Sequence, residues 1–335
     1  KYILLGSAAL TAALAFTAMA DHPHKPKKAK AEDVTPKLKK PMAKMASAEM
    51  TSKKTKKAKE TSSEKDDAKW DVMNPPGDKK EIDINVTEGT WMSLDVSPDG
   101  KTLAFDMLGD IYTMPITGGT ATNIARGLAW EMQPRFSPDG SRIAFTSDRA
   151  GGDNIWTMDV DGENKEQVTK ESFRLTNNPT WSPDGQFIAA RKHFTTSRSL
   201  GVGEIWLYHT SGGSGVQLVK KPSDSHQKEL GEPMFSPDGN YVYYSQNITP
   251  GPIFEYAQDS NTELFQIKRY DMETGEISTA AGGAGGAVRP TPSPDGKYLA
   301  YVKRVRAKSK LFIKDLKYFS RVGSFTTIYS YFRIY

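Results

Sequence analysis

The chain contains no cysteine. Its absence excludes a disulfide framework, a thiolate metal site, a cysteine nucleophile and a lipidated cysteine. It also suits an oxidising compartment, where a stray thiol would be a liability.

Signatures of catalysis are also lacking. The sequence holds neither the H-E-x-x-H of zinc peptidases nor the G-x-S-x-G of serine hydrolases. Only five histidines occur, and two of them, His22 and His24, lie in a lysine-rich stretch with no strand before it. We therefore expect no catalytic residue, metal ion or cofactor in this chain, and whether the parent protein is an enzyme stays open.

Long apolar runs are confined to the first twenty residues. This segment, residues 1–20, starts with the positively charged Lys1 and ends in Ala18-Met19-Ala20, a pattern of small residues typical of a cleavage site. This predicts a signal peptide over 1–20, cut after Ala20, and a periplasmic or secreted protein with no transmembrane segment in the mature chain. Residues 21–69 have no aromatic residue and are rich in Lys, Ala and Ser, so we expect a disordered tether.

Positive charge is concentrated at the ends of the chain. Residues 21–69 carry 15 lysines against eight acidic residues, and residues 303–335 carry nine basic residues against one. Residues 70–302 hold 20 basic and 31 acidic residues. An acidic body lacks the basic stripe of a nucleic-acid-binding surface, so no nucleic-acid partner is expected.

One tetrapeptide, Ser-Pro-Asp-Gly, occurs five times. Proline presets the first corner of a tight turn, aspartate bonds to nearby backbone, and glycine accepts positive φ. We interpret each copy as a hairpin turn and assign its aspartate to the structure of the turn. The turn aspartates are Asp99, Asp139, Asp184, Asp238 and Asp295.

Strands surround every copy. Apolar and polar residues alternate at period two on both sides of the turns, and successive turns are 40, 45, 54 and 57 residues apart. This spacing predicts an all-β fold over residues 70–317, a β-propeller of four-stranded blades with five repeats visible. Glu81–Val86 alternates too, ahead of the first repeat, as a strand that completes the last blade of a closed propeller would.

Two insertions are candidate recognition loops. The one after the second strand of the third blade begins with Arg191, Lys192 and His193 and includes Arg198, cationic or titratable side chains that suit an anionic group. The second spans Thr249–Asn261 in the fourth blade. The alternative is that both insertions are ordinary solvent-exposed loops without a ligand.

After residue 317 the repeat pattern stops. Residues 318–335 contain seven aromatic residues and no acidic one. They are either an atypical tail, as from an interrupted reading frame, or a divergent outer strand of the fifth blade.

The Ser-Pro-Asp-Gly repeats, with their Ile-Ala-Phe and Ile-Trp-x-Met-Asp strands, resemble the WD40-like repeats of TolB-type periplasmic propellers, which implies six blades. Four phrases are similar to the propeller half of large secreted bacterial amidohydrolases, in which a zinc-type metal would be expected only in the hydrolase domain. These phrases are Glu88–Ser93, Gly109–Tyr112, Gly127–Trp130 and Arg191–Phe194.

The resemblance implies a periplasmic binding module, the non-catalytic part of an amidohydrolase-family protein. Its partner would be a protein, a cell-envelope component or a cognate hydrolase domain. Two alternatives stay open: a stand-alone adaptor of the Tol-Pal system, and the gating propeller of a prolyl-oligopeptidase-like peptidase.

Overall fold

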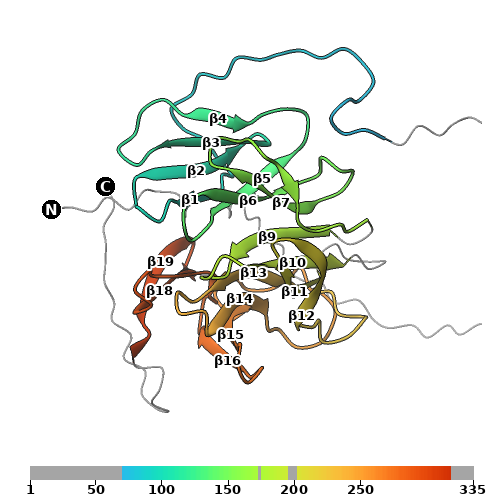
Figure 1. Cartoon of the computed structure of the whole chain (residues 1–335). Coiled ribbons are helices and arrows are strands. Elements are labelled where there is room, and N and C mark those ends of the chain that lie inside the picture. The colour runs from blue at the N-terminus through green and yellow to red at the C-terminus, as the bar shows by residue number, and fades with distance from the viewer. Residues whose placement is uncertain (1–69, 173–174, 195–201, 318–335) are drawn as a thin grey trace, which may run out of the picture. The chain divides into compact units, whose positions relative to one another are not determined.

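The computed structural model describes residues 70–172, 175–194 and 202–317. Within these ranges the chain forms 19 strands in five antiparallel sheets and no α-helix (Figure 1). The first sheet holds β1 (Leu94–Val96), β2 (Thr102–Met107), β3 (Asp110–Pro115) and β4 (Thr122–Ala125). The second holds β5 (Glu131–Phe136), β6 (Arg142–Ser147), β7 (Asn154–Asp159) and β8 (Glu166–Gln167).

The remaining three sheets repeat this plan. The third holds β9 (Leu175–Trp181), β10 (Phe187–Phe194), β11 (Val202–His209) and β12 (Gly212–Val219). The fourth holds β13 (Leu230–Phe235), β14 (Tyr241–Asn247), β15 (Phe265–Asp271) and β16 (Ile277–Ala281). The fifth has three strands, β17 (Val288–Pro292), β18 (Tyr298–Val305) and β19 (Lys308–Asp315).

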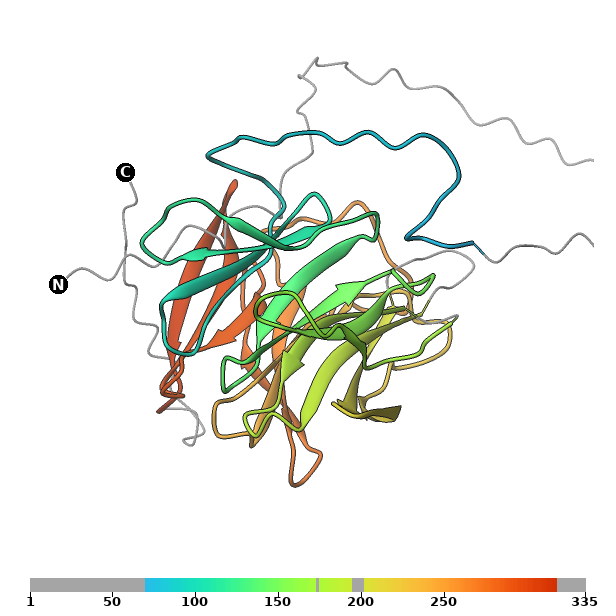
Figure 2. The ribbon, with the colours of Figure 1, turned by 45° about the horizontal axis from the view of Figure 1, so that its top comes forward.

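The sheets are the blades of a β-propeller, as the repeat predicted. Strands within each sheet are hydrogen-bonded in chain order. The first strands of the sheets form the inner side of the ring: β1 contacts β5, β5 contacts β9, β9 contacts β13, and β13 contacts β17. Figure 2 shows the sheets following one another around it.

Apolar side chains fill each junction between neighbouring blades. Ala104 and Ile111 of the first blade pack with Phe145 of the second, and similar clusters lie at the next three junctions. Successive side chains point to opposite faces of a sheet, and in a central strand such as β6 consecutive residues are buried, so both faces of the blade pack against neighbours. The core is therefore a series of inter-blade layers.

Each Ser-Pro-Asp-Gly turn is held by its own side chains. Aspartate Oδ1 accepts the serine hydroxyl at 2.5–2.6 Å in all five copies. The same oxygen accepts a backbone N–H two residues on, as Asp139 does from Ser141. The hydrogen bond from Ser137 is the main cause that lowers the pKa of Asp139 to about 2, so this carboxylate is ionised at neutral pH.

The turns of neighbouring blades touch. Gly140 has φ of +73°, and a Cβ on it would lie 3.4 Å from Cδ of Pro98 in the preceding turn. The corresponding distances are 3.9 Å from Gly185 to Pro138 and 3.7 Å from Gly239 to Pro183. Glycine is needed here for its positive φ, since a Cβ at these distances would make only ordinary van der Waals contact with the proline.

Two sequence expectations differ from the structure. Residues 81–86 form no strand, and Ile82, Ile84 and Val86 are exposed. Arg191, Lys192 and His193, expected in a loop, lie in β10, which continues to Phe194 and pairs with β11 as far as Val202. The strand persists because cross-strand pairing tolerates polar side chains that find partners on its faces. The expected signal peptide, tether and atypical tail lie outside the described residues.

Candidate functional site

The ring has two different ends. The Ser-Pro-Asp-Gly turns join the first and second strands of every blade, so they gather at one end. Because the strands are antiparallel, the β2–β3 turn, the β4–β5 connection and the end of β10 lie at the opposite end. The four phrases that resemble hydrolase-linked propellers all lie at this second end, which we call the loop end.

Two large apolar residues at the loop end stand in a strained backbone. Trp91 has φ of +64° and is 72% exposed, and Leu108 has φ of +55° and is 71% exposed. A bulky residue in the left-handed region costs about 1–2 kcal/mol. Because both side chains are exposed, burial of apolar surface does not offset this cost in free energy. At Leu108 the left-handed angle is set by the two-residue hairpin loop with Gly109, and a large apolar residue that stays exposed in such a loop is a candidate contact residue.

These two residues lie at the loop-end limits of the neighbouring strands β1 and β2. The amide of Asp106 donates to the carbonyl of Ser93 at 3.1 Å, which extends the pairing of β1 and β2. Trp91 lies two residues before Ser93 and Leu108 two residues after Asp106, so both stand just beyond these paired residues at the loop end. Trp130 completes the group: a Cβ on Gly109 would lie 2.9 Å from its indole ring, so the ring rests on the glycine and is still 52% exposed. We call Trp91, Leu108 and Trp130 the apolar patch.

Arg191 bridges the third and fourth blades. Its Nη2 atom lies 3.1 Å from Oε1 of Glu229. The side chain runs between two glycines: a Cβ on Gly203 would lie 2.6 Å from Arg191 Nε, and one on Gly231 would lie 2.8 Å from its Cδ. Arg191 thus joins two blades through a groove that glycine alone leaves open.

His193 lies on the same face of β10 as Arg191. Burial, assisted by the positive charge of Arg191, lowers the pKa of His193 to about 4. Its Nε2 atom is buried and has no hydrogen-bond partner among the described residues. The imidazole is therefore neutral at physiological pH.

Lys192 points to the other face of the strand. Its Nζ lies 2.6 Å from Oε1 of Glu171 and 4.2 Å from the centre of the Trp206 ring. The structure thus brings Arg191 and His193 together and separates Lys192 from them. Arg198 lies outside the described residues.

Polar hydrogen bonds also join neighbouring blades, and the sequence did not predict them. Gln133 has positive φ, and its backbone N–H donates to Asp106 Oδ2 at 2.6 Å. The side-chain Oε1 of Gln133 in turn accepts a hydrogen bond of 2.8 Å from the backbone N–H of Asn178, which also has positive φ. At the fourth junction Glu232 Oε2 accepts the amide of Arg289 at 3.0 Å.

The residues of these contacts share one place in the repeat. Each of the four positive-φ residues sits four positions before the serine of a turn, precedes a proline and forms a β-bulge on an inner strand. That recurring X-Pro was the signal available in the sequence, at Gln133-Pro134, Asn178-Pro179, Glu232-Pro233 and Arg289-Pro290.

The insertion of the fourth blade is anchored by a buried lysine. Lys228 is fully buried, and its Nζ donates to the carbonyls of Thr249 and Pro250 and to the Thr249 hydroxyl, each at 2.6 Å. Three donors meet three acceptors, so the ammonium is satisfied without a carboxylate. Farther along the insertion, Tyr256 is exposed at the loop end.

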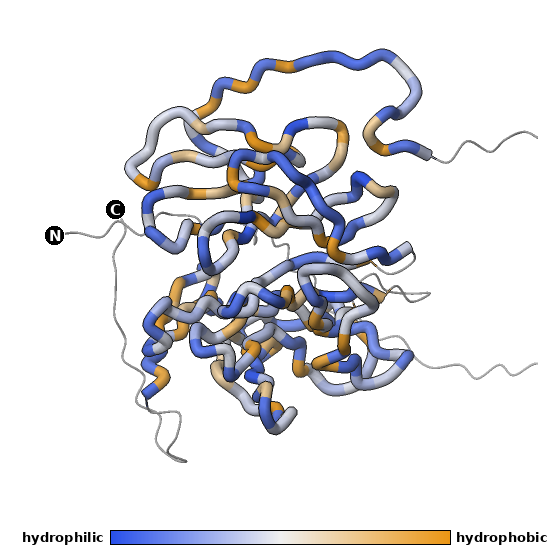
Figure 3. The backbone as a smooth tube through the Cα atoms, in the orientation of Figure 1, coloured by the Kyte–Doolittle hydropathy of each residue, from blue (hydrophilic) through white to orange (hydrophobic). Residues whose placement is uncertain are grey.

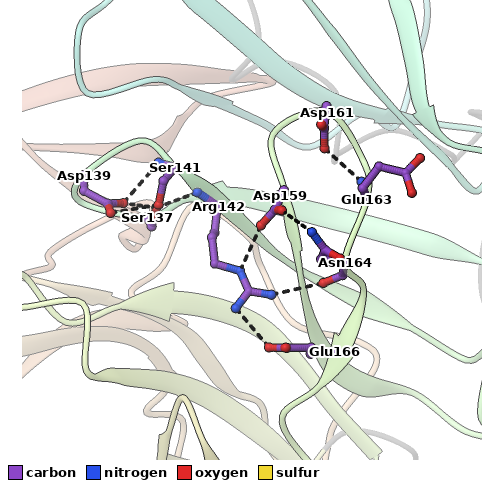
Figure 4. A network of polar contacts seen from close by, with 9 residues as sticks. All are labelled: Ser137, Asp139, Ser141, Arg142, Asp159, Asp161, Glu163, Asn164 and Glu166. Carbon is purple, nitrogen blue, oxygen red and sulfur yellow. Dashed lines mark hydrogen bonds and ion pairs between the residues drawn. The ribbon is translucent and has the colours of Figure 1, made fainter.

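The turn end carries a shallow depression of about 440 Å³ between the second and third blades. Figure 4 shows that its arginine, Arg142, is already engaged: Nη1 lies 2.9 Å from Glu166 Oε2, and Nη2 donates to the Asn164 carbonyl at 3.1 Å. Asp159 accepts from Asn164 and faces Arg142 at 3.6 Å. These contacts hold the hairpin at the end of β7.

No group of three or more metal-ligating side chains gathers in the part of the chain that the structure describes. Nor does this part contain a helix long and apolar enough to cross a membrane.

A family model described as the TolB beta propeller domain, PD40, matches residues 78–254, more than half of the chain. The chain belongs to this family. The Tol-Pal system protein TolB of Wolinella succinogenes is 30% identical over 165 residues, which are 48% of this chain and 38% of that protein. An uncharacterized protein of Agrobacterium fabrum is 29% identical and covers 62% of this chain and 68% of its own length.

A solved structure supports the fold of this TolB-like propeller. The putative TolB of Agrobacterium tumefaciens superposes with a TM-score of 0.53 at 21% identity, covering 67% of this chain and 76% of that one. The chain spans only about two fifths of the length of the Wolinella TolB.

Proposed function

We propose that this TolB-like propeller is a non-catalytic binding module of the bacterial periplasm, and that it binds a protein through its loop end. The observation that carries the proposal is the apolar patch. Trp91 and Leu108 occupy left-handed backbone yet stay exposed. Large aromatic and aliphatic anchors of this kind dominate the energetics of protein interfaces.

A cognate hydrolase domain is the partner we favour. The phrases that resemble amidohydrolase propellers include Trp91, Gly109 and Trp130. The residues that carry the resemblance therefore coincide with the strained, exposed surface. A separate envelope protein, as the membership of TolB itself in the Tol-Pal system suggests, is the alternative partner.

Site-specific photo-crosslinking tests the proposal. A photoreactive phenylalanine at position 108 should capture a periplasmic protein, whereas the same group at Lys101, exposed in the first turn at the other end, should not. Mass spectrometry of the adduct distinguishes a hydrolase polypeptide from another envelope protein. Equal capture at both positions, or none at position 108, would contradict the assignment of the loop end.

A further inference from the structure

Methionines border the apolar patch. Three of the eight methionines in the described residues lie around it, namely Met73, Met92 and Met107. Met92 directly follows Trp91, and Met107 directly precedes Leu108. We call these three side chains the methionine border. Thioethers are flexible and polarisable, and they recur on surfaces that bind apolar partners.

Two of the sulfur atoms meet over Gly89. A Cβ on this glycine would lie 2.8 Å from Sδ of Met92 and 3.6 Å from Sδ of Met107. Gly89 does not have the positive φ that requires glycine in the turns. Its missing side chain instead makes room for the Met92 sulfur. The backbone thus leaves space for two thioethers at the loop end of the first blade.

The third methionine reaches the patch from the segment ahead of β1. A Cβ on Gly127 would lie 3.3 Å from Cε of Met73. Gly127 belongs to the connection between β4 and β5, which ends at Trp130. Figure 3 shows hydrophobic stretches that interrupt the mostly hydrophilic segment to which Met73 belongs. Met73 therefore joins the part of the patch that Trp130 forms.

The methionine border is open to small solutes. Met73 is 38% exposed, and Met92 and Met107 are half-buried. By contrast, Met158 is fully buried in the core cluster between the first and second blades. A dissolved oxidant can therefore reach the three border side chains in the folded chain, whereas it reaches Met158 only when the blades open.

A thioether is oxidised by peroxides. The sulfur donates an electron pair to one oxygen of hydrogen peroxide, an S–O bond forms as the O–O bond breaks, and the other oxygen leaves as water with both hydrogens. Sulfur loses two electrons, which the peroxide gains. Because the chain has no cysteine, methionine carries all of its sulfur redox chemistry. The sulfoxide is polar, so burying it under an apolar partner costs free energy.

We propose that the methionine border is an oxidative modification site: hydrogen peroxide or a related two-electron oxidant converts Met73, Met92 and Met107 to sulfoxides and thereby releases the protein bound to the apolar patch. The release rests on the proposed function, and the modification does not. Sulfoxides beside Trp91 and Leu108 make the surface polar while the core between the blades stays unmodified. Reduction by methionine sulfoxide reductases restores the apolar surface.

Peptide mapping by mass spectrometry tests the modification without a partner. The full chain is treated with hydrogen peroxide at neutral pH, and catalase stops the reaction before digestion. Sulfoxide at Met73, Met92 and Met107 should form at least about tenfold faster than at the buried Met158. A rate at any of the three that is no faster than at Met158 would overturn the site.

Two readouts follow the effect on the apolar patch. One is the fluorescence of the dye ANS, which reports exposed apolar surface. The other is photo-capture at position 108, with the peroxide removed before a periplasmic extract is added. Both signals should fall at least about threefold after oxidation and recover after treatment with methionine sulfoxide reductases.

Leucine variants connect these effects to the border. In Met73→Leu/Met92→Leu/Met107→Leu neither signal should respond to peroxide, because leucine keeps the apolar volume and cannot be oxidised in this way. The matched control, Met114→Leu/Met234→Leu, should respond as the unmodified chain does. A response that persists in the triple variant, or an ANS signal that peroxide does not change, would overturn the proposal. Absence of capture before oxidation would contradict the proposed function alone.

Discussion

Nη2 of Arg191 in the third blade lies 3.1 Å from Oε1 of Glu229, just ahead of the fourth blade. The contact exists because Gly203 and Gly231 leave room for the arginine stem. A residue that resembled a surface anion binder in the sequence is thus part of a joint between two blades.

The first prediction concerns Gly203. A methyl group there would lie 2.1 Å from the Leu230 carbonyl oxygen and 2.6 Å from Arg191 Nε, and the carbonyl belongs to the backbone. Gly203→Ala should lower the free energy of unfolding by about 2–3 kcal/mol. Urea denaturation measures it. Gly152→Ala is the control, because its nearest neighbour, Leu175 Cδ2, is 3.6 Å away; an equal loss in both variants would disprove the steric argument.

Stability should fall as the pH drops below neutrality because of His193. Its pKa is about 4 in the folded chain against an ordinary value of 6.5, so between these values the unfolded state binds a proton that the folded state does not. The loss reaches about 2–3 kcal/mol near pH 4 and disappears as the pH rises through 6.5 to about 7.5. Urea midpoints of the chain and of His193→Gln, measured from pH 7.5 to 4, should diverge as the pH falls. Parallel curves for the unmodified chain and His193→Gln would contradict the shift.

Leu108→Asn should stabilise the fold. Leu108 and Gly109 form a two-residue hairpin loop with φ of +55° and +87°, a turn that favours Asn-Gly. We expect a gain of about 0.5–1 kcal/mol in thermal or urea unfolding, together with loss of partner capture at the loop end. Arg306→Asn at φ of +55° in the fifth blade should give the same gain and leave capture unchanged. A destabilised Leu108→Asn would mean that Leu108 supports the fold.

Lys228→Met should loosen the insertion of the fourth blade. The change leaves three oxygens of Thr249 and Pro250 without their donor, at a cost of about 2–4 kcal/mol. Chymotrypsin cleavage at the exposed Tyr256 should become faster as the loop detaches. Lys220→Met, at an exposed lysine of the same region, should change neither stability nor cleavage, and unchanged cleavage in Lys228→Met would refute the anchoring role.

The repeat was readable in the sequence because its causes are local. Ser137, Asp139 and Ser141 bond to one another within five residues, and alternation reports burial directly. The polar joints between blades could not be read in the same way. Gln133 and Asn178 are 45 residues apart and Glu232 and Arg289 are 57 apart, so only the fold brings them together.

In the candidate site, too, the sequence predicted some features and missed others. Clustered charges at Arg191–His193 predicted a shared surface, but alternation along β10 sends Lys192 to the face opposite Arg191 and His193. Trp91 and Leu108 are large apolar residues that stay exposed beside the strands of the first blade. Their exposure depends on backbone angles that sequence patterns do not report.

In three of the Ser-Pro-Asp-Gly turns the glycine lies against the proline of the turn before it, as Gly140 does against Pro98 and Gly239 against Pro183. One tetrapeptide therefore supplies both halves of a joint. A tandem duplication of a single blade would arrive already complementary to its neighbours on either side, without a compensating mutation. The contact between neighbouring blades at the turn end is therefore contained in the repeat itself.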